Sequence, residues 1–263
     1  MGIADVTAWP TWAVLILFAT GALLVMFGAR FLLARSTGRE RRAELADLAG
    51  SMNGPTGATL AFLVGFAVTI TWTTMSSAQT SVERLAAQAQ QTALLAGSVL
   101  EPADANRFSA DLRGYLNAIT DQDSVVLAGG VQTEMPSFTS LEALQGDIRV
   151  LERTTKDSSN AADVRTLQAD VVQLAQTQAE LNAVARRGLP SVVLQLLILT
   201  GCLSAATVGV LAVDIRRPYL IVGWALVIAM GLTVVIALYD PFSGSVAITF
   251  DPLSDAARRI VDH

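Results

Sequence analysis

Residues suited to metal or acid–base chemistry are scarce in this 263-residue chain. It has one histidine, the last residue His263, and one cysteine, Cys202. A single cysteine allows neither an internal disulfide nor a cysteine-based zinc site. The sequence also lacks a phosphate-binding glycine loop, a Gly-x-Ser-x-Gly motif and the acidic spacing of an EF-hand. These absences predict a protein that is not an enzyme and that uses no cofactor or metal.

Charged residues are also few, at 16% of the chain against about 25% in an ordinary soluble domain. The net charge of −5 argues against a nucleic-acid partner, which calls for a basic face. Four stretches contain no Asp, Glu, Lys or Arg: residues 6–29, 48–82, 188–213 and 218–239. A membrane-spanning helix needs about 20 apolar residues. The sequence therefore predicts four helices in a lipid bilayer, the second of them beginning at Pro55.

The arginines near the span ends predict the orientation, because cytoplasmic loops are enriched in Lys and Arg. The loops on one side carry seven arginines, five between positions 30 and 42 and two at 216 and 217. The other side has three close to the membrane, at 84, 186 and 187. This count predicts a multi-pass protein with both termini and residues 76–187 outside. Of the 18 basic residues 17 are arginine, which is typical of a GC-rich bacterial genome, so the expected location is the bacterial plasma (inner) membrane.

The segment 76–187 is acidic and has a helical pattern. Apolar and small residues recur at alternating spacings of three and four from Val82 to Val99, and again from Val164 to Ala185. We expect two long helices that leave the bilayer and pack antiparallel. The whole segment is expected to be helical, and residues 125–127 are the one candidate for a short strand.

The expected fold class is an all-α membrane protein in which a helical extracytoplasmic domain is inserted between the second and third of four transmembrane helices. The expected division is 1–75 for helices one and two with a basic cytoplasmic loop, 76–187 for the acidic domain, 188–240 for helices three and four, and 241–263 for an extracytoplasmic tail.

Two stripes of small residues run along the predicted spans. Gly57, Ala61, Gly65, Thr69 and Thr73 form one on the second span, and Gly201, Ala205 and Gly209 form the other on the third. Such stripes let helix backbones approach closely in a membrane, which favours a packing role. The alternative is a pore lined by hydroxyl groups and bare backbone.

The C-terminal region contains a turn and a group of carboxylates. Pro241 cannot continue the fourth span, Phe242 follows it, and Gly244 can turn the chain. We expect the run 246–250 to be extended and to pack on the outer helices, with Phe242 as the anchor of a latch. Asp240, Asp251 and Asp255 are oxygen donors of the kind that Ca²⁺ prefers, but solvated charges at a membrane surface explain them better.

Several segments resemble the bestrophin-like family of four-span bacterial and plant membrane proteins. The segments are 238–248 with its Pro-Phe-x-Gly turn, Asp251-Pro252-Leu253, Val82-Glu83-Arg84 through Leu100-Glu101-Pro102, and Arg186 to Pro190. The resemblance implies the four-span architecture. True bestrophins are oligomeric anion channels with a cytosolic middle domain, which makes Phe62 and Phe66 a candidate hydrophobic gate by analogy. Where the family usually carries several arginines, this chain has the uncharged run 73–79.

Two functions remain from these observations. The first is a non-catalytic assembly or accessory protein that binds itself or another membrane protein complex through the stripes and the outer helices. The alternative is a homo-oligomeric ion channel of bestrophin type. The acidic middle segment repels anions, and this favours the accessory role.

Overall fold

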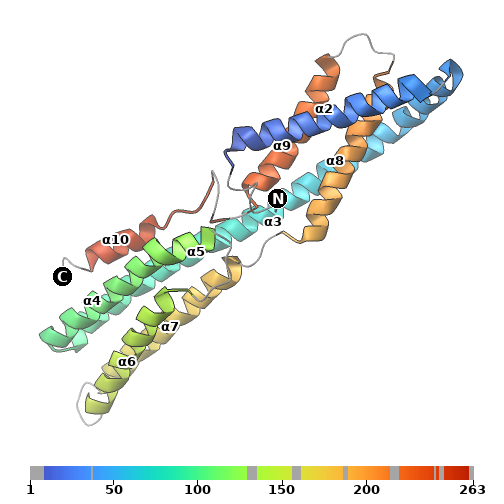
Figure 1. Ribbon diagram of the computed structural model, residues 1–263. Helices are drawn as coiled ribbons and strands as arrows, with labels where there is room; N and C mark the ends of the chain where they lie inside the picture. The colour runs from blue at the N-terminus through green and yellow to red at the C-terminus, as the bar shows by residue number, and fades with distance from the viewer. Residues whose placement is uncertain are drawn as a thin grey trace. The chain divides into compact units, whose positions relative to one another are not determined.

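The computed structural model describes residues 9–36, 38–128, 135–155, 161–185, 189–213, 219–239, 241–242 and 246–260. Of these residues, 91% are helical and none lies in a strand, so the all-α prediction is confirmed. The elements in chain order (Figure 1) are α2 (Thr11–Ser36), α3 (Arg39–Val99), α4 (Pro102–Ala118), the π-helical turn η1 (Ile119–Asp123), α5 (Ser124–Ala128), α6 (Ser137–Thr155), α7 (Ala161–Ala185), α8 (Ser191–Leu211), α9 (Tyr219–Ala237) and α10 (Asp251–Arg259).

Three helices are long and apolar enough to cross a membrane. They cover Thr11–Arg35, Glu40–Val99 and Ser191–Leu211, and Ile221–Ala237 is a shorter apolar helix. At a rise of about 1.5 Å per residue, a helix needs roughly 20 residues to cross the hydrocarbon core. The number of spans, four, stays a prediction from the sequence.

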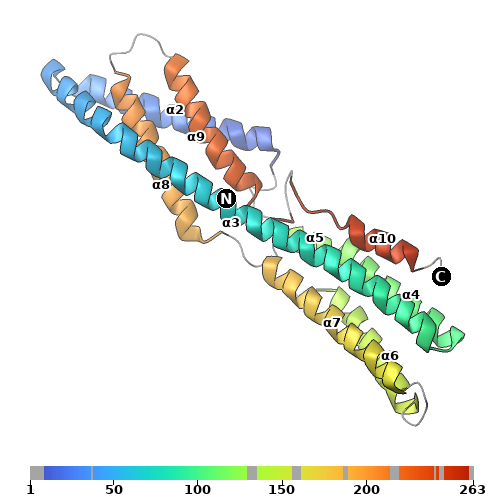
Figure 2. The same cartoon turned by 180° about the vertical axis from the view of Figure 1, so that it is seen from behind.

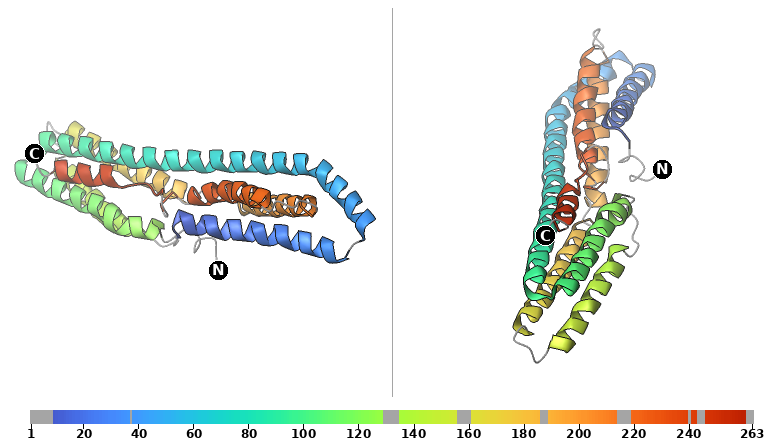
Figure 3. Two further views of the ribbon diagram at one scale, coloured as in Figure 1. Left: turned by 90° about the horizontal axis from the view of Figure 1, so that it is seen from above. Right: turned by 90° about the vertical axis from the view of Figure 1, so that its left-hand side faces the viewer.

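The second predicted span is part of a single helix of 61 residues, α3. Pro55 lies inside this helix, so the prediction that the helix begins at Pro55 was wrong. The residues before it are rich in Ala, Leu, Glu and Arg, which favour helix. Pro55 has no N–H for the carbonyl of Ser51, and loss of that bond bends a helix. The N-terminal part of α3 is bent (Figure 3, left).

By its internal contacts the described chain forms two compact units, and α3 contributes to both. The first unit comprises residues 1–73, 188–240 and 244–246. Within it α2 packs against α8 and α9, and α8 packs against α9. Its buried cluster includes Met26, Leu197, Ala205 and Ile228, with Leu60 and Ala67 from α3. One side of α3 therefore supplies core residues to this unit.

The second unit comprises residues 74–187, 241–243 and 247–263. The expected seams are buried, including Leu85 and Ala89 on α3 and Leu174 and Leu181 on α7. Two polar contacts join the helices: Arg84 pairs with Glu180 at 3.6 Å, and the Thr177 hydroxyl donates to the Gln88 side chain at 2.8 Å. The residue numbers rise on one helix as they fall on the other, so α3 and α7 are antiparallel, as Figure 2 also shows.

Two local features of this unit were not foreseen from the sequence. Residues 125–127 lie in the short helix α5 and not in a strand, because the chain continues directly from α4 through η1 without a turn that would start a new element. The C-terminal tail contains α10, which the sequence analysis missed. Its signals were present: Pro252 in the first turn, Asp251 at the start, and two arginines at the end.

Candidate functional site

One side of α3 is exposed along much of its length. We call the residues Ala61, Phe62, Gly65, Phe66, Thr69 and Thr73, which belong to the first unit, the open face, because all are exposed in the subunit. Their spacings of mostly three and four residues keep them on one side of a helix. A Cβ added to Gly65 would meet no other atom within 4 Å. This part of the small-residue stripe therefore has no partner within the described subunit.

Phe62 and Phe66 form the apolar part of the open face. Their rings stack with centroids 6.3 Å apart and an angle of 7° between planes. The side chains are 70% and 47% exposed. Burial of a Phe side chain contributes about 1.5–3 kcal/mol, so two adjacent exposed rings leave considerable apolar surface for lipid, a second subunit or a dewetted pore. Their role as a gate stays a prediction at this stage.

The stripe on α8 lies in a different environment, since Gly201, Ala205 and Gly209 are all buried. A Cβ on Gly201 would lie 3.6 Å from Leu232 of α9. A Cβ on Gly209 would lie 2.9 Å from the Cα of Met26 and 3.0 Å from its carbonyl carbon, both on α2. These glycines let α8 approach its neighbours within the subunit. The α3 and α8 stripes, similar in sequence, thus have different surroundings.

The segment around Phe242 is anchored in the second unit. Phe242 is buried and stacks on Phe250, with ring centroids 6.0 Å apart. The Ile248 N–H donates to the Pro241 carbonyl at 2.9 Å, and Ile248 is also buried, whereas Val246 is exposed. Gly244 of the predicted latch lies outside the described residues. The latch itself stays a prediction.

The carboxylates near the C-terminus do not form a metal site in the described structure. Asp255 accepts a bond of 2.6 Å from Arg258 on the same helix. Asp251 begins α10, and Asp240 lies outside the described residues. Within the described ranges no group of three His, Cys, Asp or Glu side chains is placed to bind a metal ion.

A buried polar cluster in the second unit was missed by the sequence analysis. Asp123, at the end of η1, is 2% exposed and accepts a bond of 3.1 Å from the backbone N–H of Ser137, the first residue of α6. It also accepts bonds from the Ser137 hydroxyl and from the Gln178 amide. The Tyr115 hydroxyl donates to Gln178 at 2.9 Å. The cluster thus joins α4, η1, α6 and α7.

Burial dominates the electrostatics of this cluster. Loss of hydration raises the pKa of Asp123, and the hydrogen bonds from Ser137 and Gln178 oppose that rise. Burial, with a smaller contribution from the Asp123 charge, raises the pKa of Tyr115. A sequence signal for the cluster was absent, because a π-helical turn has no distinctive composition and the four polar residues come from separate elements of the chain.

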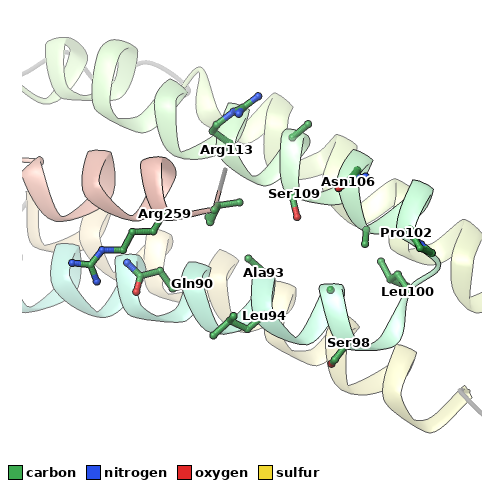
Figure 4. A pocket seen from close by; sticks show the side chains of 14 residues that line it. Gln90, Ala93, Leu94, Ser98, Leu100, Pro102, Asn106, Ser109, Arg113 and Arg259 are labelled. Carbon is green, nitrogen blue, oxygen red and sulfur yellow. The ribbon is translucent and has the colours of Figure 1, made fainter. Parts of the chain in front are cut away.

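A groove of about 900 Å³ lies in the second unit, between α3, α4 and the end of α10. Figure 4 shows Gln90 of α3 beside Arg259 of α10 at one end, and Arg113 of α4 on the other wall. Most of the lining is small or apolar, and the described lining residues include no carboxylate, histidine or cysteine. The groove therefore offers no general base or nucleophile of the usual kinds.

Comparisons with known proteins agree with the helical architecture. A bacterial bestrophin homologue from Klebsiella pneumoniae, solved as a single-residue variant, has a TM-score of 0.74 at 14% identity, with 96% of this chain and 97% of that chain covered. A second structure of the Klebsiella pneumoniae homologue has a TM-score of 0.72 at 14% identity, covering 94% and 97%. A structure described only as a membrane protein gives 0.69 at 13% identity, covering 94% and 97%. At these identities the likeness shows the fold.

No match was found among curated protein sequences. The family model described as the bestrophin-like domain matches residues 20–253, which is most of the chain. The resemblance noted in the sequence is therefore confirmed: this integral membrane protein belongs to the bestrophin-like family.

Proposed function

We propose that the protein is a homo-oligomeric ion channel whose pore is lined by the open face of α3, with Phe62 and Phe66 as a hydrophobic constriction. The observation that carries the proposal is that this face is left exposed by the subunit's own helices. The fold shared with bestrophin homologues supports it, and bestrophins are oligomeric channels.

The composition of the open face supports a pore better than contact with lipid. A helix surface that faces lipid is rich in large aliphatic residues, as on α8, where Val192, Leu199 and Leu203 are exposed. The open face of α3 instead exposes Gly65 and the side chains of Thr69 and Thr73 within its apolar run. Small and hydroxyl side chains leave room for water and ions, and two rings of Phe constrict such a path by excluding water.

The accessory role, which the sequence favoured, has less support. As predicted, it uses both small-residue stripes and the outer helices to bind the protein itself or another membrane protein complex. The contacts of Gly201 with α9 and of Gly209 with α2 use the α8 stripe inside the subunit. On α3, Gly57 is half-buried, whereas Ala61, Gly65, Thr69 and Thr73 are left exposed. A ring of identical subunits accounts for this exposed surface.

The proposal places the protein in the bacterial inner membrane with residues 76–187 outside. The support for this orientation is the count of seven arginines against three at the span ends.

The test is electrical recording from the purified full-length protein in planar bilayers, with its oligomeric mass measured in mild detergent. We expect a defined homo-oligomer that conducts. Phe62→Ala and Phe66→Ala widen the constriction and should raise the conductance. Phe31→Ala is the matched control, because Phe31 is also exposed but lies on α2, and its conductance should equal that of the wild type. A monomer, or an oligomer that passes no current with either Phe variant, would refute the channel.

A further inference from the structure

The charge-free stretches of three helices end at one level of the first unit. A Cβ added to Gly209 of α8 would lie 2.9 Å from the Cα of Met26 on α2, and one added to Gly50 of α3 would lie 3.7 Å from Leu211, the last residue of α8. Charge is absent from α2 up to position 29, from α8 up to its end, and from α3 between positions 48 and 82. Because charged groups are costly in hydrocarbon, the end of α2, the start of α3 and the end of α8 lie at one boundary of the bilayer (Figures 1 and 2).

Arginines stand just beyond this boundary on both α2 and α3. Arg30 follows Met26 by about one turn, Arg35 lies in the last turn of α2, and Arg41 lies in the first turn of α3. At about 1.5 Å per residue, Arg30 and Arg35 are about 6 and 14 Å past Met26 along the helix. The polar headgroup layer is roughly 5–8 Å deep. The arginines are therefore placed at the depth of the lipid headgroups.

A further arginine joins the two helix ends. The Arg42 guanidinium donates to the carbonyl of Ala34, one of the last carbonyls of α2, which lack a partner within their own helix. This bond holds the start of α3 beside the end of α2. The fold thus uses Arg42 to bring the arginines of the two helices to one place.

The charges of this region are not neutralised by ion pairs. Arg30, Arg35 and Arg41 form none within the described part of the chain. Arg35 and Arg41 are exposed, and Arg30 is half-buried. Residues 30–47 hold five arginines and three carboxylates, so their net charge is +2, whereas the whole chain carries −5. The boundary region therefore attracts an anion.

Exposed apolar side chains flank the arginines. Phe31 and Leu32 on α2 are 61% and 66% exposed, and Leu48 and Met52 on α3 are 56% and 44% exposed. Leu48 and Met52 are one turn apart and lie on the same side of α3. Acyl chains cover apolar side chains at this depth, while arginine side chains extend to the phosphates. The combination fits a lipid with a tail better than a free anion.

From this arrangement we propose that Arg30, Arg35 and Arg41, with their exposed apolar neighbours, form a boundary patch that binds an anionic phospholipid. Charge complementarity selects the occupant. A guanidinium pairs with a phosphate through two hydrogen bonds, and phosphatidylglycerol offers that phosphate with a net negative charge. Phosphatidylcholine carries its own cation, which the arginines repel. The inference goes beyond the proposed function and does not depend on conduction.

The experiment counts the lipids that the full-length protein retains. The protein is reconstituted in vesicles of equal parts phosphatidylglycerol and phosphatidylcholine with identical acyl chains, extracted in mild detergent, and weighed by native mass spectrometry. The wild type should retain mainly phosphatidylglycerol. Arg35→Gln combined with Arg41→Gln should lower the ratio of the two retained lipids by about 30-fold, at about fivefold per arginine. The matched control is Arg149→Gln combined with Arg165→Gln, two exposed arginines on α6 and α7. It should keep the wild-type ratio.

A second measurement distinguishes the lipid from its headgroup alone. Phosphatidylglycerol added to the detergent-solubilised wild type should raise the melting temperature, because a ligand stabilises the state that binds it. Free glycerol 3-phosphate at the same concentration should not. Equal stabilisation by glycerol 3-phosphate would mean that the patch binds a soluble anion and would overturn the lipid.

The other outcomes also decide the proposal. A wild type that retains the two lipids equally overturns it. A preference for phosphatidylglycerol that survives in the Arg35→Gln and Arg41→Gln double variant overturns the assignment to these arginines. A double variant whose oligomeric mass differs from that of the wild type would make the patch a contact between subunits and not a lipid site.

Discussion

The close approach of α2 and α8 at Gly209 gives a sharp stability prediction. In the structure, an added Cβ at Gly209 would lie 2.9 Å from the Cα of Met26 and 3.0 Å from its carbonyl carbon. Both atoms belong to helix backbone, so a rotamer change cannot relieve the clash. The two helices must move apart, or the methyl group stays overpacked. We therefore expect Gly209→Ala to destabilise the first unit.

The magnitude follows from this geometry. Overpacking a filled core costs about 1–3 kcal/mol, and a rigid backbone neighbour places Gly209→Ala near the upper end, at about 3 kcal/mol. A protein of this size loses roughly 2–4 °C in melting temperature per kcal/mol. The expected loss is therefore about 6–12 °C.

The assay is thermal unfolding of the detergent-solubilised protein, followed by tryptophan fluorescence. Gly65→Ala is the matched control, because it makes the same chemical change in a transmembrane segment where the new methyl group meets nothing within 4 Å. It should not lower the melting temperature. Any gain in helix propensity from Gly to Ala is common to both variants, so their difference isolates the steric effect. Equal melting temperatures for the two variants would refute the close approach of α2 and α8.

Three further predictions concern the second unit. Phe242→Ala removes a buried ring that stacks on Phe250 and should lower the stability by about 3–5 kcal/mol. The loss should appear as a lower melting temperature and faster proteolysis of the C-terminal segment. The control Val246→Ala, at an exposed position, should change neither measurement much. Asp123→Asn should remove a pH dependence of stability. Between the ordinary carboxyl pKa and the raised pKa of Asp123, the folded protein holds a proton that the unfolded chain has lost. The melting temperature of the wild type, relative to that of the variant, should therefore fall as pH rises through that window. Ala162→Cys, at an exposed position of α7, placed in a Cys202→Ser background, should react with a membrane-impermeant thiol reagent in intact cells.

Each of these has a result that would contradict it. A Phe242→Ala protein with unchanged melting but altered conductance makes the turn a functional site and not a latch. A melting difference between wild type and Asp123→Asn that is constant with pH means that burial does not raise the carboxyl pKa. Labelling of Ala162→Cys only after lysis means that the middle segment is cytosolic, as in true bestrophins.

The sequence by itself determined the local features of this protein. Stretches without charge identified the apolar helices, because a charged group loses its hydration in a bilayer at a high cost in free energy. The three- and four-residue spacing from Val82 onward identified the buried side of α3, because a helix repeats every 3.6 residues. The prolines at 102 and 190 stand at or directly before the first residue of a helix, α4 and α8. The family followed from short motifs, among them the Pro-Phe-x-Gly turn near the C-terminus.

Only the tertiary structure decided which helix surfaces are covered by neighbouring helices. Gly65 and Gly209 belong to similar stripes in the sequence, yet one lies on an exposed face and the other against the backbone of α2. That difference depends on where neighbouring helices pass, which no local pattern encodes. The cluster of Asp123, Ser137 and Gln178 is likewise invisible in the sequence, because its members come together only when α6 and α7 pack. Helix ends are also hard to predict from a single residue, as Pro55 inside α3 shows. A proline by itself predicts a helix start, but strong helix formers precede Pro55, and the helix therefore begins before it.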